Sequence, residues 1–470
     1  MSNGLAWLGW LFGLALLLLV AVEAFEVIEL FVDRRRETFV QQPPSFYKPF
    51  VSLHVPIHAE PPDVVKRTLR ALQALQYDRI EVLVIDNNTE DEALWRPIER
   101  FCQELGPRFR FFRLPRWPGY KAGALNFALA NTSPDASVIG VVDSDYEVDT
   151  DFLAALVGHF AKSSVGFVQA PQNYRDWESR PFFRMSYWEY WQFFAVSMHL
   201  RNRRNAILMH GTMVMVRKSA LREVGGWAEW CLTEDSELGL RLLAAGYHGV
   251  YCGKTYGRGL VPFSYRAYWR QRQRWVTGGV QTLRRHWPLF LPWRRSLTAA
   301  QKFHYLQGWA PWLRDGIIVA SLPLIIVLSV FSLGLEDTPG AVLPLASAVL
   351  ALVVYLGVRQ IIIYRLYLKR PWADGFCAGA AIFGLVPHVG VAWLRGWLQT
   401  CHDFHRTPKE PEPRSLRMTR FPIELVLGFA MAVLALGILF QFGTEGVRAA
   451  AGLGSSAVLC LSSEFTRLTE

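Results

Sequence analysis

Apolar positions divide the chain into membrane-like runs near its two ends and an alternating strand–helix region between them. The first run, residues 5–32, is long enough to cross a hydrocarbon layer of about 30 Å. Three later runs, at 317–335, 341–363 and 423–442, also have spanning length. The pattern therefore predicts four membrane crossings that flank one large domain outside the bilayer.

Charged residues beside these runs predict which side of the membrane each connection faces. Arginines at positions 34–36 follow the first run at once, and basic residues at 365, 369 and 370 follow the third. Cytoplasmic connections carry an excess of Lys and Arg, so both positions should lie in the cytoplasm. The acidic pair at 336–337 fits the opposite side. The chain is thus predicted to be a multi-pass membrane protein with a cytoplasmic central domain.

The apolar stretch 372–397 has a different pattern. Gly384, Pro387 and Gly390 interrupt it, and a complete crossing would export the basic stretch 402–420. Irregular backbone at membrane depth must be buried in protein or line a cavity. We therefore predict a re-entrant or interfacial segment here. Glutamates 23, 26 and 29 in the first run have two open interpretations: they reach water at the interface, or they line a polar conduit.

Five parts follow from these patterns. Tryptophans and arginines mixed around residue 290 suit a helix lying in the membrane interface. The predicted parts are an N-terminal transmembrane helix (1–40), a cytoplasmic domain (41–285), an amphipathic interface helix (286–310), transmembrane helices (311–445, with the re-entrant segment 372–397 and a loop at 398–420) and a C-terminal tail (446–470).

The central domain alternates short β-branched runs with helical patterns. Strands are expected at 51–56, 80–85, 109–114 and 137–142, and helices at 62–75, 122–130 and 238–243. Strand–helix alternation of this kind predicts an α/β fold with a mostly parallel sheet. Ligands of such sheets lie beyond the carboxyl ends of the strands, where Asp86 and Asp143 stand. Glycine-rich phosphate loops are absent from the sequence, so phosphate should be held by a metal and cationic side chains.

Composition narrows the class. The 470 residues are 51% hydrophobic, too apolar for an ordinary soluble enzyme. A formal charge of +10 fits basic cytoplasmic flanks and an anionic substrate, and no nucleic-acid-binding motif accompanies it. None of the six cysteines forms a CxxC pair, which argues against a zinc site or a disulfide framework.

Acidic motifs supply candidate chemistry, each with a plainer alternative. Asp143 and Asp145 follow a buried strand and could hold Mg²⁺ or Mn²⁺, although such a pair is commonly a solvated turn. Asp235 could remove a proton from a sugar hydroxyl as a general base. It also precedes a predicted helix, so it could only cap that helix.

Basic and aromatic residues supply a second set. Arg274 can bind phosphate bidentately, and Trp275 offers a flat face to a sugar ring. Gln271 precedes Arg274 by three positions, and Lys121 is a further candidate for a diphosphate contact. Their alternatives are an aromatic anchor at the membrane interface and a surface lysine.

The order and joint presence of these motifs resemble glycosyltransferase family 2, in its membrane-embedded processive branch that makes cellulose, chitin, hyaluronan, curdlan and related β-glucans. The matching segments are D-x-D at 143–145, T-E-D at 233–235, Q-x-x-R-W at 271–275, K-A-G-x-L-N at 121–126, the base-contacting aspartate at Asp86, a P-x-Y-N-E segment at 56–60, a C-G-S-like turn at 210–212 and an F-x-V-T-x-K gating loop at 404–409. The chain departs from the pattern at His58, Ala59, His210 and Arg406.

The resemblance implies a GT-A nucleotide-sugar domain inserted between transmembrane helices, and a role for each matching residue. Asp235 is the implied catalytic base, and Asp143 and Asp145 the implied ligands of Mg²⁺ or Mn²⁺. Donor binding is implied for Pro56, Glu60, Asp86, Lys121, Asp143, Gln271, Arg274, Phe404, Thr407 and Lys409, and acceptor binding for His210, Gly211, Glu234 and Trp275.

The expected function is that of a processive inverting transferase in a bacterial inner membrane. It would polymerise a β-glucan, with β-1,3 linkage favoured, from UDP-glucose and pass the growing polysaccharide across the lipid bilayer. No nucleic-acid partner is expected, and the sequence identifies no accessory subunit. The alternatives are a transferase that adds one sugar to a lipid carrier, a synthase of cellulose, a chitin-like polymer or mannan, and a transporter with a degenerate sugar-binding domain.

Overall fold

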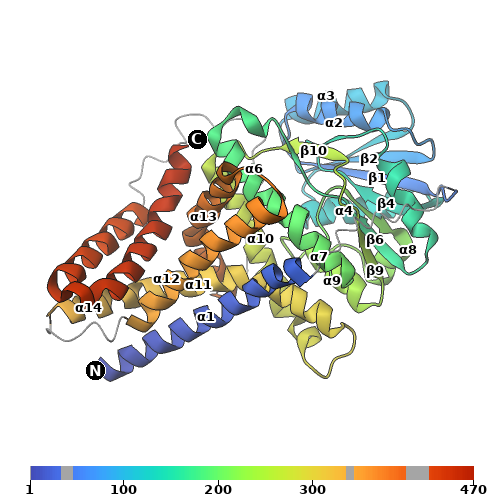
Figure 1. The fold of residues 1–470 in the computed structure, drawn as a ribbon. Helices are drawn as coiled ribbons and strands as arrows, with labels where there is room; N and C mark the ends of the chain where they lie inside the picture. Colours follow the sequence, from blue (N-terminus) through green and yellow to red (C-terminus); the bar gives the residue numbers. More distant parts are fainter. Residues whose placement is uncertain (1, 33–45, 335–342, 399–422, 470) are drawn as a thin grey trace.

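A computed structural model describes residues 2–32, 46–334, 343–398 and 423–469. A large sheet lies at one end of the molecule and long helices at the other (Figure 1). The sheet has seven strands in the order β3-β2-β1-β4-β8-β6-β9, and a second sheet has three in the order β5-β10-β7. The strands are β1 (Phe50–Ile57), β2 (Ile80–Asn87), β3 (Phe109–Leu114), β4 (Ala136–Val141), β5 (Glu147–Val148), β6 (Val165–Gln169), β7 (Tyr174–Arg175), β8 (Val214–Arg217), β9 (His248–Tyr251) and β10 (Gly257–Leu260).

The first four strands run parallel to one another, as the alternating pattern predicts. β2 is buried at every position, because helices cover both faces of a parallel sheet and leave no solvated side. β8 runs antiparallel to both β4 and β6, so the sheet is mixed with mostly parallel strands. The expected α/β fold class is therefore confirmed.

Short and medium helices cover this sheet and connect it to the long helices. Two of them carry candidate residues at their first turns: α4 before the fourth strand and α9 after the eighth. The set comprises α2 (Pro62–Gln73), α3 (Glu92–Glu104), α4 (Tyr120–Asn131), α5 (Phe152–Leu156), η1 (Val157–Ala161), η2 (Trp177–Ser179), α6 (Pro181–Gln192), the π-helical turn η3 (Phe193–Ser197), α7 (Met198–Arg203), α8 (Lys218–Glu223), α9 (Glu234–Ala244), α10 (Tyr265–His286) and η4 (Trp287–Phe290).

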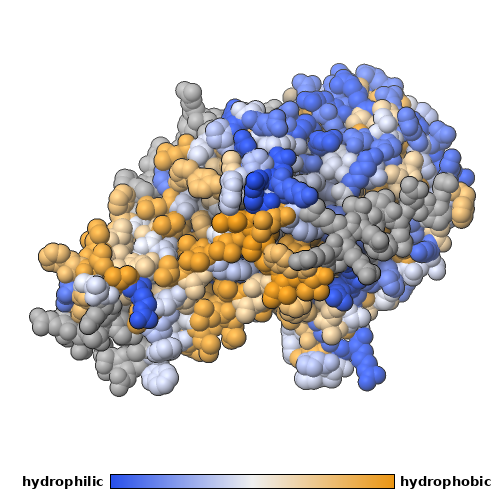
Figure 2. Space-filling model, viewed as in Figure 1, coloured by the Kyte–Doolittle hydropathy of each residue, from blue (hydrophilic) through white to orange (hydrophobic). Residues whose placement is uncertain are grey.

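Five helices among the described residues are long and apolar enough to cross a membrane. They are α1 (Ser2–Val32), α11 (Ala299–Gly334), α12 (Leu343–Gln360, continued by the π-helical turn η6, Ile361–Tyr367), α13 (Trp372–Leu398) and α14 (Ile423–Leu468). Apolar side chains gather over these helices, whereas polar side chains gather over the sheet domain (Figure 2). This distribution is that of a protein embedded in a bilayer at one end.

The stretch 372–397 is one continuous helix, α13, where we expected interrupted backbone. Its glycines serve close packing. A side chain at Gly384 would lie 2.6 Å from Thr466 Oγ1, and one at Gly390 would meet the backbone of Asp315. The small residues therefore bring α13 against neighbouring helices, and Pro387 is accommodated inside the helix. The backbone does not reverse within the segment; its orientation relative to the membrane stays a prediction.

The stretch 286–310 is not the single interface helix that its composition suggested. α10 ends at His286, the short turn η4 follows, and α11 begins only at Ala299. Pro288 and Pro292 explain the interruption, because proline lacks the backbone donor that a helix interior requires. Trp287 and Trp293 in this connection are nevertheless exposed, as expected of aromatic residues at a membrane interface.

The C-terminal residues form part of the helical bundle, although we expected a tail. Gly443 has a positive φ of 52° inside α14 and marks a kink between two helical halves. The halves fold back on each other, since a side chain at Gly428 would meet Leu461 at 2.7 Å. The Thr469 hydroxyl lies 3.3 Å from Met185 Sδ on α6. The chain end thus returns to the sheet domain, not to the far end of the bundle.

The glutamates of α1 point into the protein and meet basic residues of other helices. Glu23 lies 2.6 Å from Arg314 of α11, and Glu26 lies 2.6 Å from Arg359 of α12. Glu29 lies 3.8 Å from the His304 ring. Arginines therefore neutralise the first two carboxylates inside the bundle, which corrects the interpretation that they reach water at the interface.

Candidate active site

The carboxyl ends of β1, β2 and β4 meet at one edge of the large sheet, where the candidate site lies. Asp86 is the last residue but one of β2 and lies opposite Ile57 at the end of β1. Asp143 stands two residues beyond β4. Because β8 runs antiparallel to β4, the turn 210–212 that precedes β8 lies beside Asp143. The Asp143 backbone N–H donates to Thr212 Oγ1 at 3.0 Å.

Lys121 links three segments of this edge through one ammonium group. It lies in the first turn of α4, which begins after Gly119 in the left-handed conformation (φ 78°). Its Nζ donates to Asp143 Oδ1 at 2.6 Å and to the Gly211 carbonyl at 2.8 Å. Glu234 Oε1 lies 4.0 Å away. Burial lowers the pKa of Lys121, but these carboxylates raise it overall, so the group stays charged.

Gly211 is a close-contact position in the same cluster. A side chain there would place its first carbon 2.9 Å from Lys121 Nζ and 3.0 Å from Asp235 Oδ2. Only glycine leaves the space between the ammonium group and the carboxylate open. The predicted acceptor-side turn therefore lies directly against the predicted base.

Burial raises the pKa values of the two acids at the start of α9, Glu234 and Asp235. It raises the pKa of Asp235 above its usual range, while the positive charge of Lys121 partly opposes the shift. Burial and the neighbouring Asp235 raise the pKa of Glu234 as well. The backbone N–H of Ser236 donates to Asp235 Oδ1 at 2.7 Å, so the carboxylate is held by local backbone. A carboxylate with raised pKa accepts protons more readily, which suits a general base.

Arg274 on α10 completes the charged cluster. Burial lowers the pKa of Arg274 overall, and the negative charges of Glu234, Asp143 and Asp235 partly oppose this shift. α10 approaches the 233–235 segment closely because Gly278 has no side chain; a carbon there would lie 2.7 Å from the Thr233 nitrogen. The Gln281 amide oxygen of α10 also accepts from the Leu232 N–H at 2.9 Å.

Asp145 is fixed by the second sheet. Its Oδ2 accepts from the Leu260 N–H at 2.8 Å, and its carbonyl accepts from Arg175 at 2.6 Å. Two carboxylates after a strand, Asp143 and Asp145, are the oxygen ligands that Mg²⁺ and Mn²⁺ bind, with water and substrate phosphate supplying the rest. The residues therefore fit a divalent cation. The described residues contain no group of three or more candidate metal ligands, so the substrate would have to contribute to the site.

Asp86 and its surroundings form the other half of the edge. Burial raises the pKa of Asp86 to about 6, and the Thr89 hydroxyl donates to its carboxylate. Thr89 Oγ1 also accepts from the Ala59 N–H at 2.8 Å, which fixes the loop between Pro56 and Glu60. The Asn87 amide donates to the Tyr120 carbonyl at 2.6 Å, directly beside Lys121. These bonds connect the expected nucleoside end to the diphosphate end of the site.

His210 supports the site through its backbone N–H and through the packing of its ring. Its N–H donates to Gln169 Oε1 at 2.8 Å, and its ring makes edge contacts with Phe193 and Phe194. Burial lowers its pKa to about 3, so the imidazole is neutral near pH 7 and does not carry protons for a reaction.

Sequence reasoning missed the residues that hold Gln271 and Trp275 in place. Arg272 is buried, and its Nη1 donates to Gln271 Oε1 at 2.8 Å. Its guanidinium lies 4.2 Å from the centre of the Trp275 ring and pairs with Glu189 of α6. The Tyr190 ring stacks on the Trp275 ring, with 5.7 Å between the ring centres. The aromatic tract 177–194, to which Glu189 and Tyr190 belong, thus supports α10. The signal available in the sequence was the arginine inside the Q-x-x-R-W motif.

The structure brings most of the predicted residues to one place. Lys121, Asp143, Gly211, Glu234 and Asp235 are in contact or near contact, and Arg274 interacts with the carboxylates. Asp145 lies on the same turn as Asp143. A second group, Pro56, Glu60 and Asp86, lies along the same edge of the sheet, and Gln271 and Trp275 flank Arg274 on α10. The gating-loop residues Phe404, Thr407 and Lys409 lie outside the described residues.

A mostly parallel sheet with two carboxylates after a central strand, a lysine beside them and an acid at the start of a following helix defines a nucleotide-sugar transferase of the GT-A type. The family model described as "Glycosyl transferase family group 2" matches residues 138–386, more than half of the chain. The chain therefore belongs to this family, and the protein is a glycosyltransferase. The expected family and enzyme class are confirmed.

Curated relatives include polysaccharide-forming enzymes. A cellulose synthase catalytic subunit (UDP-forming) of Pseudomonas fluorescens is 28% identical over 64% of this chain and 42% of its own length. A probable glucomannan 4-beta-mannosyltransferase of Oryza sativa is 26% identical over 50% of this chain and 46% of its own length. The chain thus spans less than half the length of these relatives.

A solved structure shares the fold. The mannosyltransferase PcManGT from Pyrobaculum calidifontis, in complex with GDP-Man and Mn²⁺, has a TM-score of 0.57 with 18% sequence identity, over 82% of this chain and 99% of that one. At this identity the likeness supports the GT-A fold.

Proposed function

We propose that this glycosyltransferase is a processive polysaccharide synthase of the bacterial inner membrane that makes a β-glucan, with β-1,3 linkage favoured, from UDP-glucose. The proposal rests on the contact between the helices of membrane-spanning length and the catalytic edge, by which we mean the sheet edge with the candidate active site and helix α10 beside it. α10 bears Gln271, Arg274 and Trp275 and packs along α13. Gln273 donates to the His388 carbonyl at 3.3 Å, and Tyr265 donates to the Gly384 carbonyl at 2.6 Å.

This contact supports processive transfer. A transferase that adds one sugar can release its product to solvent or to a lipid carrier, and needs no such coupling. Here Trp275, which is predicted to lie on the acceptor side, belongs to α10, which packs along α13, and its ring lies 5.7 Å from that of Tyr190 on α6. A polymer end held at Trp275 would therefore start beside helices of spanning length. The curated relatives are named for the synthesis of cellulose and glucomannan, and both of these products are polymers, which also supports polymer formation.

The proposed reaction is an in-line displacement that inverts the anomeric carbon. The acceptor hydroxyl oxygen forms the new bond to that carbon while Asp235 takes the hydroxyl proton. The bond from the anomeric carbon to the diphosphate breaks, and its electron pair leaves with the diphosphate. Lys121 and Arg274 are placed to stabilise the leaving charge, and Gln271 to donate to it. A divalent cation bound by Asp143 and Asp145 would add positive charge at the same diphosphate.

The donor has a second candidate. One curated relative named above is a probable glucomannan 4-beta-mannosyltransferase, and the solved neighbour is a mannosyltransferase in complex with GDP-Man. A β-mannan from GDP-mannose is therefore the alternative to a glucan from UDP-glucose.

The test uses the full chain in lipid nanodiscs with labelled UDP-glucose, UDP-N-acetylglucosamine or GDP-mannose, each with Mg²⁺ or Mn²⁺. The expected product is a ladder from UDP-glucose that a β-1,3-glucanase digests. A ladder that only a β-mannanase digests would show that the polymer is a mannan. A ladder that only a β-1,4-glucanase digests would show that the glucan has β-1,4 linkages. A single added sugar would refute processivity, and no transfer from any donor would refute the synthase.

A further inference from the structure

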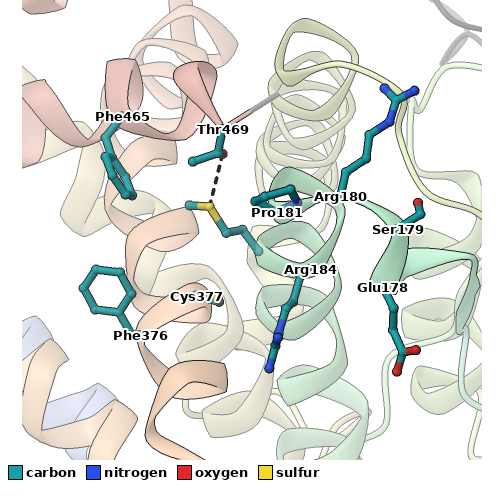
Figure 3. Close-up of a pocket in the computed structure, with 10 residues that line it drawn as sticks. Glu178, Ser179, Arg180, Pro181, Arg184, Phe376, Cys377, Phe465 and Thr469 are labelled. Atoms are coloured by element: carbon teal, nitrogen blue, oxygen red, sulfur yellow. Dashed lines mark hydrogen bonds between the residues drawn. The ribbon is translucent and has the colours of Figure 1, made fainter.

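A cavity of about 390 Å³ lies outside the catalytic edge, where α6, α13 and the end of α14 meet (Figure 3). None of its residues belongs to the candidate active site. Its lining consists of Glu178, Ser179, Arg180, Pro181, Arg184, Met185, Phe376, Cys377, Phe465 and Thr469. The three walls come from parts of the chain that are far apart in sequence.

The lining has an apolar side and a charged side. Phe376 of α13 and Phe465 of α14 stand on one side, and Arg180 and Arg184 stand on the side of α6 (Figure 3). An occupant that matches both sides needs an apolar chain and a polar head.

Positive charge predominates at the polar side. Arg184 and Arg370 share one carboxylate, that of Asp374, at 2.7 and 3.0 Å. Asp374 is fully buried, so it holds the two guanidinium groups without facing the cavity. Arg180 is exposed as well and lies over the Phe183 ring. Among the described residues at this junction, the guanidinium groups of Arg180, Arg184 and Arg370 outnumber two carboxylates, those of Glu178 and the buried Asp374, which favours an anionic head group.

The cavity lies at the level expected for lipid head groups. It opens at the first turns of α13, a helix long and apolar enough to span a membrane. Trp372 and Phe376 at this end are 59% and 68% exposed. Aromatic side chains beside arginines at the end of an apolar helix mark the membrane interface. Basic pockets between membrane helices on the cytoplasmic side are sites where anionic lipid head groups bind.

We propose that this cavity binds an anionic glycerophospholipid. Its phosphate lies between Arg180 and Arg184, and one acyl chain packs along Phe376, Cys377 and Phe465. The rest of the lipid stays in the bilayer, because the cavity is too small for a whole molecule. The lipid would bridge α6, α13 and the end of α14, a junction that otherwise includes the Thr469 contact with Met185.

The test counts bound lipid on the intact chain. The protein, stripped of lipid in detergent, is offered phosphatidylglycerol or phosphatidylcholine, and native mass spectrometry measures retention. Wild type should retain phosphatidylglycerol and little phosphatidylcholine. The double variant Arg180→Gln/Arg184→Gln should weaken phosphatidylglycerol binding about 30-fold, because each arginine near a membrane surface contributes roughly a factor of five. Cys377→Phe, which fills the apolar side, should weaken it with all arginines intact.

A matched control separates this site from general charge attraction. Arg294→Gln/Arg295→Gln removes the same charge from the exposed connection beside Trp293 and should leave retention unchanged. Equal loss in both double variants would overturn the site, as would equal retention of phosphatidylcholine by wild type. Competition by inorganic phosphate alone, without an effect of Cys377→Phe, would identify a phosphate site and refute the lipid.

Discussion

Arg272 should decide which end of the Gln271 amide faces the donor. The guanidinium engages the amide oxygen at 2.8 Å, which leaves the NH₂ group as the end that can turn to a ligand. A diphosphate offers only acceptors, so this is the orientation that binds it. Glu189 holds Arg272 in turn, and it also accepts from the Tyr268 hydroxyl at 2.9 Å.

The substitution Arg272→Met tests this positioning role and has two separable effects. It leaves the Glu189 carboxylate, whose side chain is 18% exposed, without its cation. Removing one member of a buried pair costs about 3–5 kcal/mol of stability. A second change, Glu189→Gln, removes the stranded charge and keeps an acceptor for the Tyr268 hydroxyl. The double variant should therefore recover most of the stability.

Donor binding should not recover with stability. Without Arg272 the amide can rotate, and a hydrogen bond to the charged diphosphate is lost, which is worth about 1.5–3 kcal/mol. At about 1.4 kcal/mol per factor of ten, affinity for UDP or GDP should fall roughly 10- to 100-fold in both variants. Gln271→Glu, which can still pair with Arg272 but cannot donate, should show the same loss.

Thermal unfolding and calorimetric titration of UDP and GDP with Mn²⁺ measure the two effects. Arg217→Met is the control, because Arg217 binds backbone carbonyls at the opposite end of β4 from Asp143 and should affect stability alone. The reasoning is refuted if Arg272→Met binds the nucleotides within twofold of wild type, or if affinity returns together with stability in the double variant.

Four further outcomes test the catalytic edge. Asp235→Asn should lower turnover by about 10²–10⁴ while nucleotide affinity stays within a few-fold, and a normal product ladder would remove the base assignment. The carboxylate is the active form and burial raises its pKa, so turnover should fall on acidification at a pH above the ordinary aspartate value of about 3.9; an acid limb at or below that value contradicts this. Gly278→Ala should reduce turnover at least tenfold with unchanged helix content by circular dichroism, because the new methyl carbon pushes α10 from Thr233; full activity would show that α10 can shift freely. Chelation should abolish transfer and Mn²⁺ restore it, whereas Asp145→Ala should need more Mn²⁺; activity in excess chelator would exclude a metal role.

Local pattern predicted much of the fold. The β-branched runs that end at Asp86 and Asp143 became β2 and β4, because a fully buried strand requires an uninterrupted apolar run. The positions of the acids followed from this, since parallel strands end at the same edge. Asp86 and Asp143 could therefore be placed at one edge of the sheet before any contact was known, whereas the resemblance to the family supplied the roles of Asp235 and Arg274.

Local pattern failed where a neighbour in space determines the meaning of a residue. Gly384 and Gly390 were interpreted as interruptions of a helix, yet both lie inside α13. Glycine suits these positions because Thr466 and Asp315 of neighbouring helices pack closely against them. The segment after Gly443 read as a tail, because its apolar face is defined only by the helices on which it folds back.

The sequence by itself determined the transferase: the strand ends, the acidic motifs and the apolar helices follow from composition and spacing within short windows. The tertiary structure decided how these parts are held. Glu189 and Arg272 are 83 residues apart, and Arg184 and Asp374 are 190 apart. Such pairs leave no periodic trace, because a buried charge is stabilised by whichever partner the folded chain brings to it, and not by its neighbours in sequence.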